Sequence, residues 1–210
     1  MKEIKVKVTY TEELLGTSPA NQQLYEDFIA SNAPDAPSRK QEIEAHGVME
    51  VTEKAMTVFP RLSEDELRDM GFDTDGDVPF TWDYQWKGYF KDSCGMLRNA
   101  TGTKSSKFTA YKKKIDGLVF VKERKVPLVL PDGGCTGECR RPLRADTPQG
   151  PRVALAYSET VPAGTTQEFT IVLLKDDMEG LVHEWLDYGI LHGTGQWRNS
   201  GKGRFTVEYL

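Results

Sequence analysis

Alternation of apolar and polar residues is the clearest local pattern in this chain, and it predicts strands near both ends. Residues 3–10 (EIKVKVTY) place Ile, Val and Tyr on one phase and Lys on the other, which is typical of a half-buried strand. A second strand is predicted after the turn at Pro162, because every second residue from Phe169 to Leu173 is apolar. Residues 204–210 (RFTVEYL) predict a final strand.

Apolar residues spaced three and four apart predict helices between these strands. Residues 176–189 predict an amphipathic helix, and residues 63–72 a charged surface helix whose Ser-x-x-Glu start fits a capping box. Two further helices are predicted before residue 56. The core face of the 176–189 helix is predicted to carry Leu181, Val182, Trp185 and Leu186.

The aromatic segment 81–100 (TWDYQWKGYFKDSCGMLRNA) combines two patterns. Its alternating Trp82, Tyr84 and Trp86 predict one face of a strand. The following Lys87-Gly88 pair predicts the start of a helix, where free backbone N–H groups and the lysine would form an anion site. Two short apolar runs, GLVFV and VPLVL, predict neighbouring strands further on.

Strands that alternate with helices in an antiparallel layout predict an α+β fold. The order fits a ferredoxin-like (RRM-like) antiparallel sheet with helices on one face. Residues 1–210 are predicted to form a single domain, with 11–75 as an acidic, helical insertion or cap within it. The insertion is inferred because 11–75 lies between two predicted strands of the core.

Charge is distributed unevenly along the 210 residues, although the net charge is only −5. Residues 1–90 contain 9 Lys or Arg against 18 Asp or Glu, whereas residues 91–125 contain 10 against 3. The basic stretch could supply phosphate contacts to a nucleic acid. The alternative is that its lysine run at 112–114 simply keeps one helix face in water.

The N-terminal residues lack the apolar stretch of a signal peptide, and no apolar run reaches the ~18 residues of a membrane span. A cytoplasmic protein of a bacterial host cell, with no membrane partner, is therefore expected. Three cysteines, an odd number, do not fit a secreted disulfide framework. Cys135 and Cys139 alone have metal-like spacing, and reduced thiols or a local disulfide are expected there rather than zinc, with no cofactor.

A glycine-rich segment near the C-terminus, residues 189–205 (GILHGTGQWRNSGKGRF), is the strongest candidate for function. Glycines let main-chain N–H groups approach phosphates closely, and basic residues among them add charge. Trp197 could stack on a base. The alternative is a bulged turn packed on the 176–188 helix, with Trp197 filling the core. A second candidate is the arginine-rich segment around Arg144, predicted to be a phosphate-facing loop.

Three segments, in order, resemble motifs of the RAMP superfamily, which includes backbone subunits and guide-processing endonucleases of CRISPR effector complexes. The first is YQWKGYFKDSCGMLRNA, the second ETVPAGTTQEFTIVLL and the third GTGQWRNSGKGRFTV. The matching residues are Lys87, Gly88, Leu97, Arg98, Glu159, Pro162, Gly164, Thr165, Phe169, Gly193, Gly195, Arg198, Gly201, Gly203 and Arg204.

This resemblance implies a glycine loop lying against RNA backbone, and hence a protein that binds RNA or another single-stranded nucleic acid. A non-catalytic role is expected because His46, His183 and His192 match no motif of the family's endonucleases. A homo-oligomer is also implied, since RAMP backbone subunits assemble head to tail. The expected binding residues are Lys87, Gly88, Lys91, Arg98, Lys112, Lys113, Arg144, Gly193, Gly195, Trp197, Arg198, Gly201, Lys202, Gly203 and Arg204.

Two other functions stay open at this point. The chain also resembles stand-alone phage or prophage proteins, which suggests a counter-defence (anti-CRISPR-like) protein that occupies a host defence complex. A metal-independent ribonuclease using His192 as general acid or base is the third interpretation. Asp92 lies in the Lys-Gly motif and is a formal catalytic candidate, whereas His192 falls in no family motif that can be matched.

Overall fold

The computed structural model describes residues 1–19, 56–73, 76–147 and 150–210, with side chains omitted for 143–155. The two helices predicted before residue 56 fall in 20–55, outside the described residues. The chain forms two compact units, and each is described by itself. Unit 1 contains Met1–Leu14, Pro60–Cys135 and Val161–Leu210, and unit 2 contains Leu15–Phe59 and Thr136–Thr160. The single domain with an insertion at 11–75 stays a prediction.

Unit 1 is built on a four-stranded sheet. Its strands are β1 (Lys2–Tyr10), β6 (Val119–Val121), β10 (Thr166–Leu173) and β11 (Phe205–Tyr209). They lie in the order β11-β1-β10-β6, and each neighbouring pair is antiparallel. The three strands predicted from alternation are thereby confirmed. These pairs join segments from the two ends of the chain: Ile4 of β1 lies opposite Ile171 of β10, and Val8 of β1 lies opposite Val207 of β11.

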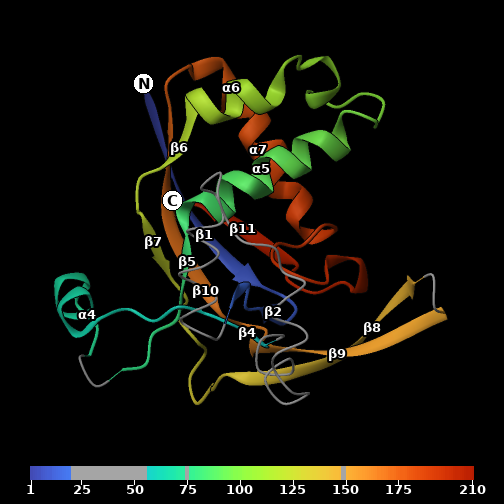
Figure 1. Cartoon of the computed structure of the whole chain (residues 1–210). Helices are drawn as coiled ribbons and strands as arrows, with labels where there is room; N and C mark the ends of the chain where they lie inside the picture. The colour runs from blue at the N-terminus through green and yellow to red at the C-terminus, as the bar shows by residue number, and fades with distance from the viewer. Residues whose placement is uncertain (20–55, 74–75, 148–149) are drawn as a thin grey trace, which may run out of the picture. The chain divides into compact units, whose positions relative to one another are not determined.

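Two helices connect these strands in a β-α-β-β-α-β order. Helix α5 (Asp83–Leu97) precedes β6, and helix α7 (Glu179–Asp187) lies between β10 and β11. Figure 1 shows both helices on the same side of the sheet. This connectivity and strand order are those of a ferredoxin-like fold, so the predicted fold class is confirmed.

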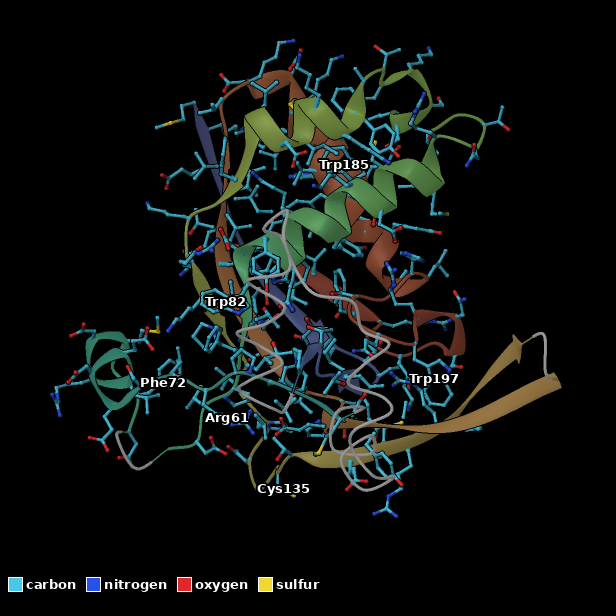
Figure 2. The ribbon with its side chains drawn as sticks, viewed as in Figure 1. Arg61, Phe72, Trp82, Cys135, Trp185 and Trp197 are labelled. Carbon is cyan, nitrogen blue, oxygen red and sulfur yellow. The ribbon has the colours of Figure 1, made fainter. Side chains whose placement is uncertain are left out.

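The core of unit 1 lies between this sheet and its helices. From Ile4 onward every second side chain of β1 is buried, and the four apolar residues predicted on the core face of the 176–189 helix are all buried too. Trp86 of α5 lies at the centre, with its ring 4.5 Å from that of Phe169 and 5.5 Å from that of Phe205. Trp185 of α7 is also fully buried, and Figure 2 shows it among the helices.

The predicted strand through Trp82, Tyr84 and Trp86 is wrong, because α5 already begins at Asp83. Strand β5 (Phe80–Trp82) ends at Trp82, whose backbone N–H donates to the Gln85 side chain in a cap. An acidic residue in the first turn also favours a helix start there. The helical spacing of Trp86, Tyr89, Phe90 and Cys94 outweighs the shorter period-two pattern.

The VPLVL run does not pair with GLVFV as predicted. Strand β7 (Lys125–Pro127) instead pairs antiparallel with β5, and GLVFV is divided between helix α6 (Tyr111–Leu118) and β6. Their apolar content predicts that both runs are strands, but which strand each run pairs with depends on contacts between residues far apart in the sequence.

Unit 1 also contains helix α4 (Glu64–Met70), with the predicted capping box at Ser63 and Glu66. Two short helical turns, η1 (Ser105–Lys107) and η2 (Asp176–Met178), belong to it as well.

A buried polar network joins the β5–β7 pair to the main sheet. Tyr10 donates through its hydroxyl to Gln167 Oε1 at 2.9 Å, and the Gln167 amide donates to Thr81 Oγ1 and to the Val126 carbonyl at 2.8 and 2.9 Å. Gln167 is completely buried. A buried polar group without its partner costs ~1–3 kcal/mol, so this network specifies how the two sheets meet.

Replacing Gln167 with leucine is expected to lower the free energy of unfolding by about 2–3 kcal/mol, because three buried polar partners lose their hydrogen bonds. Urea denaturation followed by circular dichroism measures this change. Tyr10→Phe, which removes one hydroxyl, is the control and is expected to cost about 1 kcal/mol. A Gln167→Leu protein as stable as the Tyr10→Phe protein would contradict the network's role.

Unit 2 has a sheet in the order β2-β9-β4-β3, with β8 paired to β9. Its strands are β2 (Leu14–Leu15), β3 (Ser18–Pro19), β4 (Met56–Val58), β8 (Gly137–Thr147) and β9 (Gly150–Val161). The loop predicted around Arg144 is therefore wrong: Arg144 lies in β8, opposite Val153 of β9. Pro142 is compatible with β8 because, among the described strands, β8 pairs only with β9, and an edge strand leaves one set of backbone groups outside the ladder.

Candidate nucleic-acid interface

The glycine-rich segment follows α7 and leads into β11. It contains the turns η3 (Tyr188–Ile190) and η4 (Arg198–Ser200). The backbone crosses itself where Thr194, between the two turns, meets Gly203, just before β11. At the crossing, Thr194 N–H donates to the Gly203 carbonyl at 2.9 Å. A Cβ on Gly203 would lie 2.0 Å from Thr194 O, and one on Gly193 would lie 2.2 Å from Lys202 O. Both positions therefore require glycine.

Trp197 lies at the tip of this crossed loop. It has φ 58°, the left-handed conformation that favours glycine, and its side chain is 40% exposed. The alternative in which Trp197 fills the core is therefore wrong. The residue immediately precedes η4, and the Ser200 N–H donates back to its carbonyl at 3.0 Å. Figure 2 shows its side chain at the end of the loop.

Glu13, which follows β1, anchors the returning half of the loop. Its carbonyl accepts from Gly203 N–H at 2.8 Å, and its carboxylate pairs with Lys202 Nζ at 2.8 Å. Lys202, predicted as a phosphate contact, is thus placed in an ion pair. No pattern in the sequence pointed to Glu13, since 189 positions separate it from Lys202.

Three polar side chains meet beside the loop. Asp92 of α5 has one carboxylate oxygen, Oδ2, that lies 2.5 Å from His192 Nε2 and 2.5 Å from Arg198 Nη1. Arg198 Nη1 also lies 3.3 Å from His192 Nε2. All three side chains are 20–33% exposed, so solvent or a ligand reaches the cluster.

Aromatic rings hold the imidazole of this cluster. His192 stacks on Tyr188, with ring centroids 5.2 Å apart and planes 12° apart, and lies 6.5 Å from the ring of Tyr89. Burial raises the pKa of Tyr89 well above its usual range, and its hydroxyl donates to the Trp185 carbonyl at 2.8 Å. The arrangement combines a fixed imidazole, a carboxylate and a guanidinium. The guanidinium can bind a phosphate ester, and the imidazole can transfer a proton to or from it.

The predicted basic residues of α5 have partners within unit 1. Because α5 begins at Asp83, Lys87 and Gly88 lie inside the helix, and the anion site predicted at a helix start there is wrong. Lys87 donates to the Asp116 carbonyl at 3.0 Å and lies 4.1 Å from the Phe120 ring centroid. Burial lowers the pKa of Lys87. Lys91 pairs with the Asp116 carboxylate at 2.9 Å.

The other predicted residues lie in several places. Arg98 follows α5 and lies 5.1 Å from the Tyr111 ring centroid. Lys112 and Lys113 are exposed on α6, as expected of either interpretation of the lysine run. Arg204 is exposed beside Gly201, and Gly195 and Gly201 both have positive φ. One loop thus brings together Trp197, Arg198, Lys202 and Arg204 with the predicted glycines Gly193, Gly195, Gly201 and Gly203.

Metal-binding residues do not gather in the described part of the chain, where no three His, Cys, Asp or Glu form a group. Cys94, Cys135 and Cys139 are free thiols. Burial raises the pKa of Cys94, whereas Cys135 is exposed. Among the described helices, none has both the length and the apolar composition to cross a membrane.

Comparison with known proteins gives low structural similarities. No family model and no curated protein matches the chain. It is similar to a chain of the Type III-B Cmr-β complex bound to cognate target RNA, with TM-score 0.44 and 11% identity. The match covers 100% of this chain, which thus spans 61% of that chain's length. It is also similar to a chain of a Type IV-B CRISPR complex, with TM-score 0.47, 12% identity, and coverage of 100% and 90%.

Proposed function

We propose that this protein is a RAMP-like protein that binds RNA or another single-stranded nucleic acid through the loop at 191–204. The observation that carries the proposal is the crossing at Gly193 and Gly203, which presents Trp197 at the surface next to Arg198. A half-exposed indole can stack on a base of any identity, and guanidinium groups bind phosphate oxygens. Arg204, exposed after the crossing, supplies a second cation.

Binding at this loop must overcome the ion pairs that its cations already make. Arg198 pairs with Asp92 and Lys202 with Glu13. Partly exposed ion pairs are worth at most ~1 kcal/mol, so a phosphate can exchange for the carboxylate at small cost. We therefore expect moderate affinity that falls as salt rises, with a slope set by the few phosphates contacted.

The test replaces Arg198 and Arg204 together with glutamate and measures binding of a labelled single-stranded RNA by fluorescence anisotropy. Loss of affinity by more than about tenfold at low salt is expected. The control is Arg68→Glu with Lys175→Glu, which reverses two exposed cations that also pair with carboxylates, outside the loop. Equal affinity in the two double variants would overturn the proposal. A further double variant, Arg198→Gln with Arg204→Gln, repeats the test without adding negative charge beside Asp92.

Asp92→Asn is expected to raise RNA affinity about fivefold at low salt. Removing the carboxylate's unit charge, at about 4 Å from a bound phosphate, weakens their repulsion in water by ~1 kcal/mol. The asparagine still accepts a hydrogen bond from Arg198. The same anisotropy titration measures the change. Asp65→Asn, which removes an exposed carboxylate paired with Arg68 on α4, is the control. Weaker binding by Asp92→Asn would show that the carboxylate's charge is needed to position Arg198.

A second candidate function is metal-independent RNA cleavage, and the cluster of Asp92, His192 and Arg198 favours it. The imidazole would take the proton of a ribose 2′-hydroxyl, whose oxygen attacks the adjacent phosphorus. A 2′,3′-cyclic phosphate then forms as the bond from phosphorus to the 5′-oxygen of the next nucleotide breaks, and that oxygen takes a proton from water. His192→Ala should abolish cleavage while RNA binding persists. Cleavage that survives His192→Ala would remove this candidate.

A further inference from the structure

Three aromatic side chains form a ladder where β5 meets α5. Phe80 is buried, and the ring of Trp82 meets it edge-on at a centroid distance of 5.0 Å. Tyr84 stacks on Trp82, with ring planes 15° apart and centroids 6.2 Å apart. Tyr84 remains 51% exposed. The ladder thus runs from the core to the surface and ends in an exposed phenol ring.

The base of the ladder is held firmly in unit 1. Trp82 packs, together with Phe72 and Val78, against a buried cluster of Leu62, Leu67 and Phe80; Figure 2 labels Phe72 and Trp82. Lys125 is the register partner of Trp82 in the β5–β7 pair, and the Gln85 side chain accepts from the Trp82 N–H. The ring on which Tyr84 stacks therefore has a fixed position.

Two cationic side chains of this protein, Arg124 and Lys125, already lie against the rings of the ladder. The Arg124 guanidinium carbon lies 5.2 Å from the Trp82 ring centroid and 5.9 Å from that of Tyr84. Lys125 Nζ lies 4.9 Å from the Phe80 centroid and 5.6 Å from that of Trp82. Asp83 pairs with Arg124, and Glu66 pairs with Lys125. A cationic ligand would meet like charge here, whereas a planar ring without positive charge would not.

We propose that Tyr84 is a stacking platform for an unpaired nucleobase of single-stranded nucleic acid. This inference rests on the proposed function and adds a second contact to it, separate from the glycine-rich loop. Trp82 and Arg124 both lie against the Tyr84 ring, and the half of Tyr84 that remains exposed offers its surface to a base. Stacking on an aromatic side chain is sequence-tolerant, because every base has a flat face.

The test uses the full chain, with Tyr84→Ala and Tyr84→Phe, and two ligands that differ only in their bases. One ligand is a short oligoadenylate, and the other is the same ribose-phosphate chain with abasic positions throughout. Tyr84→Ala is expected to weaken oligoadenylate binding about tenfold and to leave abasic binding within about twofold. Tyr84→Phe keeps the ring and should bind both ligands like the wild type. Thermal unfolding confirms that the variants are folded.

Two outcomes overturn the platform: an unchanged affinity of Tyr84→Ala for oligoadenylate, or an equal loss for both ligands. Failure of the proposed function is recognised separately, because the Arg198/Arg204 double variant would then bind both ligands like the wild type. If the wild type binds neither ligand, adenosine at millimolar concentration tests the ring directly. Shifted Tyr84 ring resonances in NMR spectra support the platform, and unshifted ones overturn it.

Discussion

Replacing Trp86 with alanine is expected to lower the free energy of unfolding by about 3–5 kcal/mol. Its side chain is 2% exposed and touches the rings of Tyr89, Phe90, Phe169 and Phe205, which come from α5, β10 and β11. Alanine would leave a cavity that these rings could fill only in part, so both the transfer free energy and the contacts would be lost. Urea denaturation, followed by tryptophan fluorescence and circular dichroism, measures the loss.

Trp197→Ala is the matched control for stability. The same atoms are removed, but the side chain is 40% exposed, and we expect a change in unfolding free energy below about 1 kcal/mol. RNA affinity should respond in the opposite order. Trp197→Ala should weaken binding, whereas Trp86→Ala should bind normally at temperatures where it stays folded. Equal destabilisation by the two substitutions would show that Trp86 does not organise the core.

Gly203→Ala is expected to disrupt the crossed loop and to reduce RNA affinity by more than about tenfold. The added Cβ would lie 2.0 Å from Thr194 O, a backbone atom, at a residue whose φ is +69°. A side chain in this conformation costs roughly 1–2 kcal/mol before the clash is counted. The hydrogen bond from Thr194 to Gly203 and that from Gly203 to Glu13 would both be broken. RNA anisotropy and hydrogen exchange at Thr194 measure the two effects.

Gly102→Ala separates the clash from the conformational strain. Gly102 has φ +87°, but nothing lies within 4 Å of a Cβ placed there. It should therefore cost only the strain of a positive φ, about 1–2 kcal/mol, and leave RNA binding intact. If Gly203→Ala binds RNA as well as Gly102→Ala does, then the crossing does not form the binding surface.

Local patterns in the sequence predicted the elements whose causes are themselves local. The alternation at 3–10 and from Phe169 to Leu173 gave strands with the predicted buried phase, and the apolar spacing at 176–189 gave a helix. The capping box at Ser63 is another short-range effect and is confirmed. At 82–86 two periods compete: three aromatic residues at every second position predict a strand, but the longer helical spacing of apolar residues prevails.

Partners and site geometry depended on contacts between distant residues. The sequence presents Asp92 and His192 as separate catalytic candidates, and only the fold places their side chains 2.5 Å apart although 100 positions separate them. The exposure of Trp197 and the pairing of Lys202 with Glu13 have the same origin. The ladder at Tyr84 required both the early start of α5 and the pairing of β5 with β7.

The sequence by itself therefore determined the ferredoxin-like class and the position of the glycine-rich loop, because periodicity, capping and glycine content act over a few residues. Only the tertiary structure decided which charges are neutralised, which aromatic rings reach the surface and which glycines are sterically required. Those properties arise where segments far apart in the chain meet. The crossing of Thr194 with Gly203 against Glu13 is the clearest case, since residues from both ends of the chain form it.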